Sequence, residues 1–231
     1  MARLAWSRLR TLTIISGAFG MFRRQAVVAV GGYSLGTVGE DLELVLKLHR
    51  HLKEEGTDYR IEFIPEPVCW TEVPESLAVL GRQRTRWQRG ALEAFSKHKE
   101  MLFRSRYGRI GWLGFGHMLL VDVLGPIVEL LGYMLIPISW GFGILDVDYL
   151  LAFLALTFTF AIFISVGSLV LEEFELKRFP RARHLAVLTL AAILENLGYR
   201  QINNFWRVRG LVQFLRGARG WGEMKRLGLA R

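Results

Sequence analysis

Glu40 and Asp41 are the first adjacent carboxylates in this sequence, and together they could activate a hydroxyl group. They follow a glycine-rich stretch, residues 33–39, and open residues 41–52, whose leucines and valine recur at helical spacing. We therefore expect both acids in the first turn of a helix, where free N–H groups and the helix dipole favour negative charge. An acid in that position could instead serve as a general base towards a substrate hydroxyl.

A second group of residues has the pattern Q-x-x-R-W, formed by Gln83, Arg86 and Trp87. On a helix these positions are i, i+3 and i+4, so the three side chains share one face. A guanidinium group matches phosphate oxygens in a two-pronged geometry, and an indole ring can stack on a sugar or a base. The alternative is a solvated basic helix with one tryptophan packed in the core, because short basic and aromatic patterns are common.

Ser16 and Gly17 belong to a run of small residues that would let the backbone approach a ligand closely. This run follows a β-branched segment, residues 11–15, which predicts a strand. The alternating pattern of residues 59–64 and the extended residues 68–72 predict two more strands. We expect the main helices of this part over residues 23–30, 41–52 and 75–101.

The composition indicates a membrane protein with basic flanks. Hydrophobic residues make up 52% of the chain, yet the formal net charge is +9. Lysine and arginine lie beside apolar segments, which favours contact with anionic membrane lipids and argues against nucleic acid as the partner. The single cysteine, Cys69, excludes an internal disulfide and a cysteine-based zinc site.

Two domains are expected, residues 1–109 and residues 110–231. The second domain contains two predicted membrane spans, residues 123–145 and 149–171, and the latter carries no charge. Residues 185–206 predict an interfacial or re-entrant helix, followed by a basic tail. The loop between the spans lacks lysine and arginine, so the positive-inside rule places it outside and residues 1–109 and the tail in the cytoplasm. Asp146 and Asp148 form a D-x-D pattern in that loop, so we do not interpret them as a metal site.

Taken in order, the Ser16–Gly17 segment, the Glu40–Asp41 pair and Q-x-x-R-W, followed at once by membrane spans, resemble the carboxy-terminal half of membrane-bound family-2 glycosyltransferases. This group contains the cellulose, chitin and hyaluronan synthases. The motifs cover residues 10–110 of this sequence, whereas the membrane part is similar only in architecture. The resemblance implies part of an α/β domain of the GT-A type, followed by helical membrane segments.

The resemblance also implies an inverting sugar transfer from a nucleotide-activated donor to a glycan or lipid-linked acceptor. Asp41 matches the aspartate of the family's E-D motif, which takes the proton from the acceptor hydroxyl, with Glu40 beside it. Gly39 stands where threonine is common in the family. Gln83, Arg86 and Trp87 match the residues that line the acceptor end and help to hold the donor pyrophosphate. Ser16 and Gly17 match the small segment beside the acceptor.

The family also needs a nucleotide-binding half with acidic motifs that hold the nucleotide and Mg²⁺ or Mn²⁺. We expect these ligands outside this chain, in a missing amino-terminal half or a separate subunit, so the chain alone would not transfer sugar. The expected location is the plasma membrane, with several spans. One alternative is a non-catalytic scaffold or pseudo-enzyme of a polysaccharide synthesis or export complex. Another is a small channel that uses Asp122 and Glu129.

Overall fold

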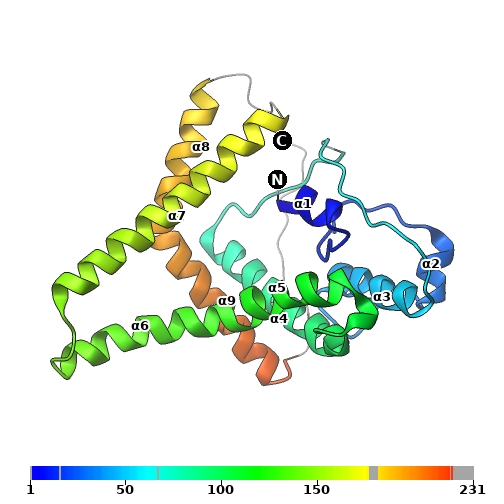
Figure 1. The fold of residues 1–231 in the computed structure, drawn as a ribbon, viewed down its shortest axis with the longest axis horizontal. Helices are drawn as coiled ribbons and strands as arrows, with labels where there is room; N and C mark the ends of the chain where they lie inside the picture. The colour runs from blue at the N-terminus through cyan, green and yellow to red at the C-terminus, as the bar shows by residue number, and fades with distance from the viewer. Residues whose placement is uncertain (1, 16, 67, 177–181, 219, 221–231) are drawn as a thin grey trace. The chain divides into compact units, whose positions relative to one another are not determined.

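The computed structural model describes residues 2–15, 17–66, 68–176, 182–218 and 220 (Figure 1). Within these ranges the chain forms helices joined by turns and irregular segments, and it contains no β-strand. The prediction of an α/β fold is therefore wrong for this chain. Each of the segments expected to be a strand is irregular.

The failure of the strand predictions has a physical cause. A strand pattern records a preference of side chains, whereas a strand exists only when its N–H and C=O groups pair with a neighbouring strand. Within residues 59–64, the Phe63 amide donates to Ser7 Oγ at 3.0 Å. Ile64 and Trp70 are 62% and 91% exposed, so these two residues are not packed under a second layer.

The chain divides into two compact units. Among the described residues, the first contains those from 2 to 126 together with 206–218 and 220, and the second contains those from 127 to 205. The expected division into residues 1–109 and 110–231 stays a prediction. The helical elements that lie within the first unit are α1 (Ala2–Arg8), α2 (Arg24–Ala29), α3 (Glu40–Glu54), α4 (Leu77–His98), η1 (Lys99–Met101), η2 (Ser105–Tyr107), η3 (Ile110–Gly114), α5 (Phe115–His117) and η4 (Met118–Leu124).

The core of the first unit forms where α3 packs against α4 and the segments that follow it. Helix α3 is amphipathic and buries Leu42 and Leu46, while α4 buries Ala91 and Ala94. Each fully buried leucine contributes roughly 2 kcal/mol. Helix α4 starts after Ser76, whose Oγ accepts a hydrogen bond from the Val79 amide at 3.3 Å. The rest of the core cluster comprises Met101, Tyr107, Ile110, Phe115 and Met118.

The second unit holds most of the apolar helices. Its elements are α6 (Gly125–Gly141), which begins at the boundary, α7 (Val147–Leu176), α8 (Ala182–Leu194), η5 (Glu195–Tyr199) and the first turns of α9 (Arg200–Leu215). Among the described residues, two helical runs are long and apolar enough to cross a membrane, Ile110–Gly141 and Val147–Phe174. The second run contains the expected span of residues 149–171. The first run begins before the expected span of residues 123–145 and ends at Gly141.

Polar side chains connect the helices of the second unit. Helix α8 packs against α7 (Figure 1). Ser165 Oγ of α7 donates to Glu195 Oε1 at 3.0 Å, and Arg200 of α9 pairs with Glu129 of α6 at 3.3 Å. Glu129 therefore faces protein, because an ionised side chain within an apolar run needs a partner. The helical run breaks at Leu197 and Gly198, where Gly198 has a φ of +99°.

The D-x-D pattern has a structural role at the start of α7. Asp146 Oδ1 accepts hydrogen bonds from the amides of Asp148 at 2.9 Å and Tyr149 at 3.2 Å. A carboxylate that binds the free N–H groups of a first helical turn acts as an N-terminal cap. The contacts of Asp146 therefore agree with reading this pattern as a helix start.

Candidate functional site

Asp41 lies at a pocket of about 330 Å³ in the first unit. Its carboxylate is half-buried, and Oδ1 accepts a hydrogen bond from the Leu42 amide at 2.8 Å. Glu40 lines the same pocket. The two acids occupy the first turn of α3, as the sequence predicted. The other residues that line this pocket are Ile15, Gly17, Gly20, Phe22 and Tyr33.

Gly17 approaches the Asp41 carboxylate more closely than any larger residue could. A Cβ atom built at position 17 would lie 2.8 Å from Asp41 Oδ2, inside van der Waals contact. The small-residue segment thus leaves the carboxylate open to the pocket without a side chain in front of it. Ser16, the other candidate of this segment, lies outside the described residues.

The Q-x-x-R-W residues lie on α4, as expected, but they are not among the residues that line this pocket. Gln83 and Arg86 are partly buried, and Trp87 is 53% exposed. The Arg84 guanidinium lies over the Trp87 ring, 4.6 Å from its centre, which is the geometry of a cation–π contact. The structure therefore brings Gly17, Glu40 and Asp41 together, and it leaves Trp87 available on the surface of α4.

A close backbone contact between two glycines connects the start of α3 with the helix that carries Q-x-x-R-W. A Cβ atom at Gly90 would lie 2.8 Å from the Gly39 amide nitrogen, so the backbone at the start of α3 rests directly on α4. Gly39 is the residue before Glu40. On α4, positions 83, 86, 87 and 90 fall on one face, because residues three, four and seven apart are neighbours on a helix. The start of α3 therefore touches the face of α4 that carries Q-x-x-R-W, about one turn after Trp87.

The loop between α2 and α3 forms one wall of the pocket through Tyr33, and two lysine side chains hold this loop in place. Lys47 Nζ donates to Gly32 O and to Ser34 Oγ, both at 2.9 Å. Lys97 Nζ of α4 donates to the same Ser34 hydroxyl at 2.8 Å. The residues on both sides of Tyr33 are thus tied to the two main helices.

Glu43 is the carboxylate on which both lysines converge. Its side chain is fully buried, and its Oε1 lies 2.8 Å from Lys97 Nζ and 3.0 Å from His98 Nε2, while its Oε2 lies 3.4 Å from Lys47 Nζ. Burial raises the pKa of Glu43, but the hydrogen bonds from His98, Lys97 and Ser34 and the charge of Lys47 outweigh it. They hold the pKa far below its ordinary value. Sequence analysis did not single out Glu43, although its spacing of four residues from Lys47 was a signal.

The far end of the same loop is fixed by a second acid of α4. Glu93 Oε2 accepts from the Thr37 hydroxyl and from the Val38 amide, both at 2.9 Å. Together with the Ser34 contacts, these bonds hold the loop against α4 up to Gly39. The wall of the pocket is therefore preorganised by hydrogen bonds whose partners lie on α3 and α4.

The carboxylates at the pocket do not make a metal site by themselves. Among the described residues, no group of three or more His, Cys, Asp or Glu side chains has the geometry to hold a metal ion. Glu40 and Asp41 provide two carboxylates at the pocket. In nucleotide-dependent enzymes, Mg²⁺ also needs the phosphates of the substrate as ligands.

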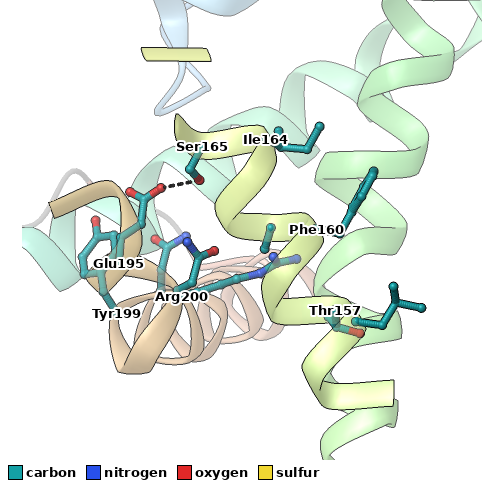
Figure 2. A pocket seen from close by; sticks show the side chains of 11 residues that line it. Thr157, Phe160, Ile164, Ser165, Glu195, Tyr199 and Arg200 are labelled. Atoms are coloured by element: carbon teal, nitrogen blue, oxygen red, sulfur yellow. Dashed lines mark hydrogen bonds between the residues drawn. The ribbon is translucent and has the colours of Figure 1, made fainter. Parts of the chain in front are cut away.

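A larger pocket, of about 730 Å³, lies within the second unit (Figure 2). Helix α7 supplies its apolar side, including Phe160 and Ile164, and η5 and α9 supply Glu195, Tyr199 and Arg200. Its single carboxylate, Glu195, accepts the hydrogen bond from Ser165 drawn in Figure 2. The Asp41 pocket offers two carboxylates and is the better candidate for acid–base chemistry.

Comparison with known proteins confirms the family resemblance. The sequence model of the family described as "Glycosyl transferase family group 2" matches residues 1–166. The chain is 40% identical over 79 residues to the poly-beta-1,6-N-acetyl-D-glucosamine synthase of Staphylococcus aureus (strain COL), a match that covers 34% of this chain and 18% of the relative.

The corresponding synthase of Staphylococcus epidermidis is 35% identical over 82 residues, which cover 36% of this chain and 18% of that protein. The matches thus span about a fifth of the length of these relatives. No solved structure is similar at a significant level. The family match covers more than half of the chain, and we conclude that this protein belongs to glycosyl transferase family group 2.

Proposed function

We propose that this chain takes part in an inverting transfer of a sugar from a nucleoside-diphosphate donor to a hydroxyl of a glycan or lipid-linked acceptor. In this proposal the chain supplies the acceptor side and the general base. The observation that carries it is the Asp41 carboxylate, half-buried at a pocket of about 330 Å³ and faced by the backbone of Gly17. Membership of the family supports sugar transfer as the chemistry.

In the proposed step, Asp41 accepts the proton of the acceptor hydroxyl while the hydroxyl oxygen attacks the anomeric carbon. The bond from that carbon to the donor phosphate breaks on the opposite side, so the configuration inverts and the nucleoside diphosphate leaves with the bonding electrons. Negative charge grows on the diphosphate, and the Arg86 guanidinium would stabilise it. Glu40 would accept a hydrogen bond from another hydroxyl of the acceptor.

Trp87 would hold a sugar ring by stacking. Its indole is exposed on α4, and the Arg84 guanidinium covers one ring face at 4.6 Å. The staphylococcal relatives are named as synthases of poly-beta-1,6-N-acetyl-D-glucosamine, and a nucleoside-diphosphate derivative of N-acetylglucosamine is therefore the first donor to test.

The donor nucleotide and its Mg²⁺ or Mn²⁺ would be held by further polypeptide, either a preceding half or a separate subunit. The match covers 18% of the staphylococcal synthase, so the aligned segment is a small part of that protein.

The proposed setting is the cytoplasmic face of the plasma membrane, with several spans. Cys69, the single cysteine, is exposed in the first unit and can report the side of the membrane. A membrane-impermeant maleimide should label Cys69 in inside-out vesicles and leave it unlabelled in right-side-out vesicles. A Cys69→Ser variant gives the background signal, and labelling in the opposite orientation would refute the cytoplasmic placement.

Substitution of Asp41 tests the catalytic proposal. In the enzyme assembled with its nucleotide-binding half, Asp41→Asn should reduce sugar transfer by about 1,000-fold, because the amide cannot accept the proton. Asp58→Asn is the matched control, since Asp58 is exposed and pairs with Arg10 at the surface. If Asp41→Asn retains full transfer, the chain is better described as a non-catalytic scaffold of the complex.

A further inference from the structure

The part of helix α9 from Trp206 onward contacts the side of α4 that is opposite to Q-x-x-R-W. Cβ atoms built at Gly81 and Gly210 would lie 2.6 Å from Trp206 Nε1 and from Thr85 O, respectively, so small residues allow the two helices to meet closely. On α4, positions 81, 85 and 88 form one stripe, being four and then three residues apart. At 100° per residue, this stripe faces about 180° away from the mean direction of Gln83, Arg86 and Trp87.

Arg207 of α9 is the polar centre of this contact. Its Nε donates to Gln88 Oε1 at 3.0 Å, its Nη2 donates to Val121 O, and Nη2 lies 3.9 Å from the Asp122 carboxylate. Gln88 in turn donates through Nε2 to Asp122 O. One guanidinium group thus joins α4, η4 and α9, and its side chain is only 19% exposed.

We propose that Arg207 is a positioning residue that fixes the rotation of α4 about its own axis and thereby aims Gln83, Arg86 and Trp87. The role in transfer rests on the function proposed above. Gln88, the residue after Trp87, is 5% exposed, and the Arg207 bond holds its amide on the side of α9. A rotation of α4 would break this bond and turn the Trp87 ring in the same movement.

The geometry favours this role over the one that the sequence suggested. The sequence analysis placed Arg207 in a basic tail that contacts anionic headgroups. Such a role needs only a positive charge, and Arg209 would fill it equally well because it is exposed on the same helix. The contacts of Arg207 instead require a planar fork with donors in fixed directions, which lysine does not have.

Hydrogen exchange in the detergent-purified chain tests the local role. In Arg207→Gln, amides of residues 83–90 should exchange about tenfold faster than in the unaltered chain, while amides of α3 from Leu44 to Leu48 keep their protection. Arg207→Lys should fall between the two, and Arg209→Gln should match the unaltered chain. Unchanged exchange at residues 83–90 would overturn the proposal, and so would an equal loss of protection in α3.

Activity gives a second readout in the enzyme assembled with its nucleotide-binding half. Arg207→Gln should lower kcat/KM about tenfold, because a small misplacement of binding groups reduces the rate strongly. Arg209→Gln should have no effect. If the assembled enzyme shows no sugar transfer at all, the proposed function fails while the exchange result still decides the role of Arg207. Full kcat/KM in Arg207→Gln would overturn the role in transfer.

Discussion

Asp41 and Glu43 lie two residues apart on the same helix, and their surroundings are opposite. Asp41 is half-buried at a pocket, and its Oδ1 accepts a hydrogen bond from the amide of the next residue. Glu43 is fully buried, with Lys47, Lys97 and His98 around its oxygens. A carboxylate that must accept a proton needs room for a substrate, whereas one that holds helices together needs its oxygens occupied. The difference separates a candidate for chemistry from a structural acid.

Replacing each acid by its amide should separate these roles most clearly. Glu43→Gln should lower the free energy of unfolding by about 3 kcal/mol, because it leaves the lysines beside a neutral group. This value takes the partial exposure of Lys97 into account. Asp41→Asn should change the same quantity by less than about 0.5 kcal/mol. Urea denaturation of the purified chain, followed by circular dichroism, measures both. Equal losses would remove the distinction.

The free energy of unfolding should depend on pH in two separate ranges. His49 is buried, Nε2 lies 2.9 Å from Leu12 O and Nδ1 lies 2.6 Å from the Tyr59 hydroxyl. Burial lowers the pKa of His49 from 6.5 to about 4. The unfolded chain therefore binds a proton first as the pH falls below 6.5, and the free energy of unfolding should fall by about 2.5 kcal/mol by pH 4.5.

The second window belongs to Glu43 and has a different origin. Its pKa in the folded chain lies far below the ordinary value of 4.5, so its contribution is complete above pH 4.5 and is lost as the pH falls towards the folded pKa. His49→Gln should flatten the profile between pH 6.5 and 4.5, and Glu43→Gln should flatten it only below 4.5. If Glu43→Gln flattens the upper window instead, the assignment is wrong.

Gly17→Ala should have a moderate effect on sugar transfer, because position 17 faces the Asp41 carboxylate. The added methyl group would meet Asp41 Oδ2 at 2.8 Å and push the carboxylate from its place. Sugar transfer in the assembled enzyme should fall about tenfold, with little change in the unfolding midpoint. Gly36→Ala is the matched control, because a Cβ atom there meets nothing within 4 Å. Equal activity of the two variants would contradict the close approach of Gly17.

The smallest effect is expected at a surface ion pair. Arg10 Nη1 lies 2.7 Å from Asp58 Oδ1, but the two side chains are 46% and 83% exposed. Water and salt weaken such pairs, so Asp58→Ala should change the free energy of unfolding by less than about 0.5 kcal/mol. The same denaturation assay measures it. If Asp58→Ala lowers the free energy of unfolding as much as Glu43→Gln does, burial does not determine how much these ion pairs contribute to stability.

Local chemistry was predictable from the sequence where it depended on neighbours along the chain. Helix α3 was expected over residues 41–52 and runs from Glu40 to Glu54, and α4 was expected over 75–101 and runs from Leu77 to His98. The strands were not predictable in this way, since a strand needs a partner that no local pattern specifies. The family assignment from the motifs is confirmed, whereas the roles of the site residues stay predictions.

Contacts between distant residues were beyond the sequence. Nothing near Gly39 indicates that it meets Gly90, because a glycine can serve a turn, a cap or a close approach. Arg207 looked like one more basic residue of the tail, and its contacts with Gln88, Val121 and Asp122 distinguish it from Arg209. In the sequence Glu43 is an ordinary helical acid, and only the folded chain shows that Lys97 and His98 of α4 contact its carboxylate.

The meeting of Gly39 and Gly90 has a mechanical consequence. Two backbones in direct contact contain no rotatable side chain that could absorb a displacement. If a bound sugar shifts Trp87 and with it α4, the contact between Gly90 and Gly39 moves the residue before Glu40 as well. Sugar binding at Trp87 would then change the position of the Asp41 carboxylate through this one backbone contact.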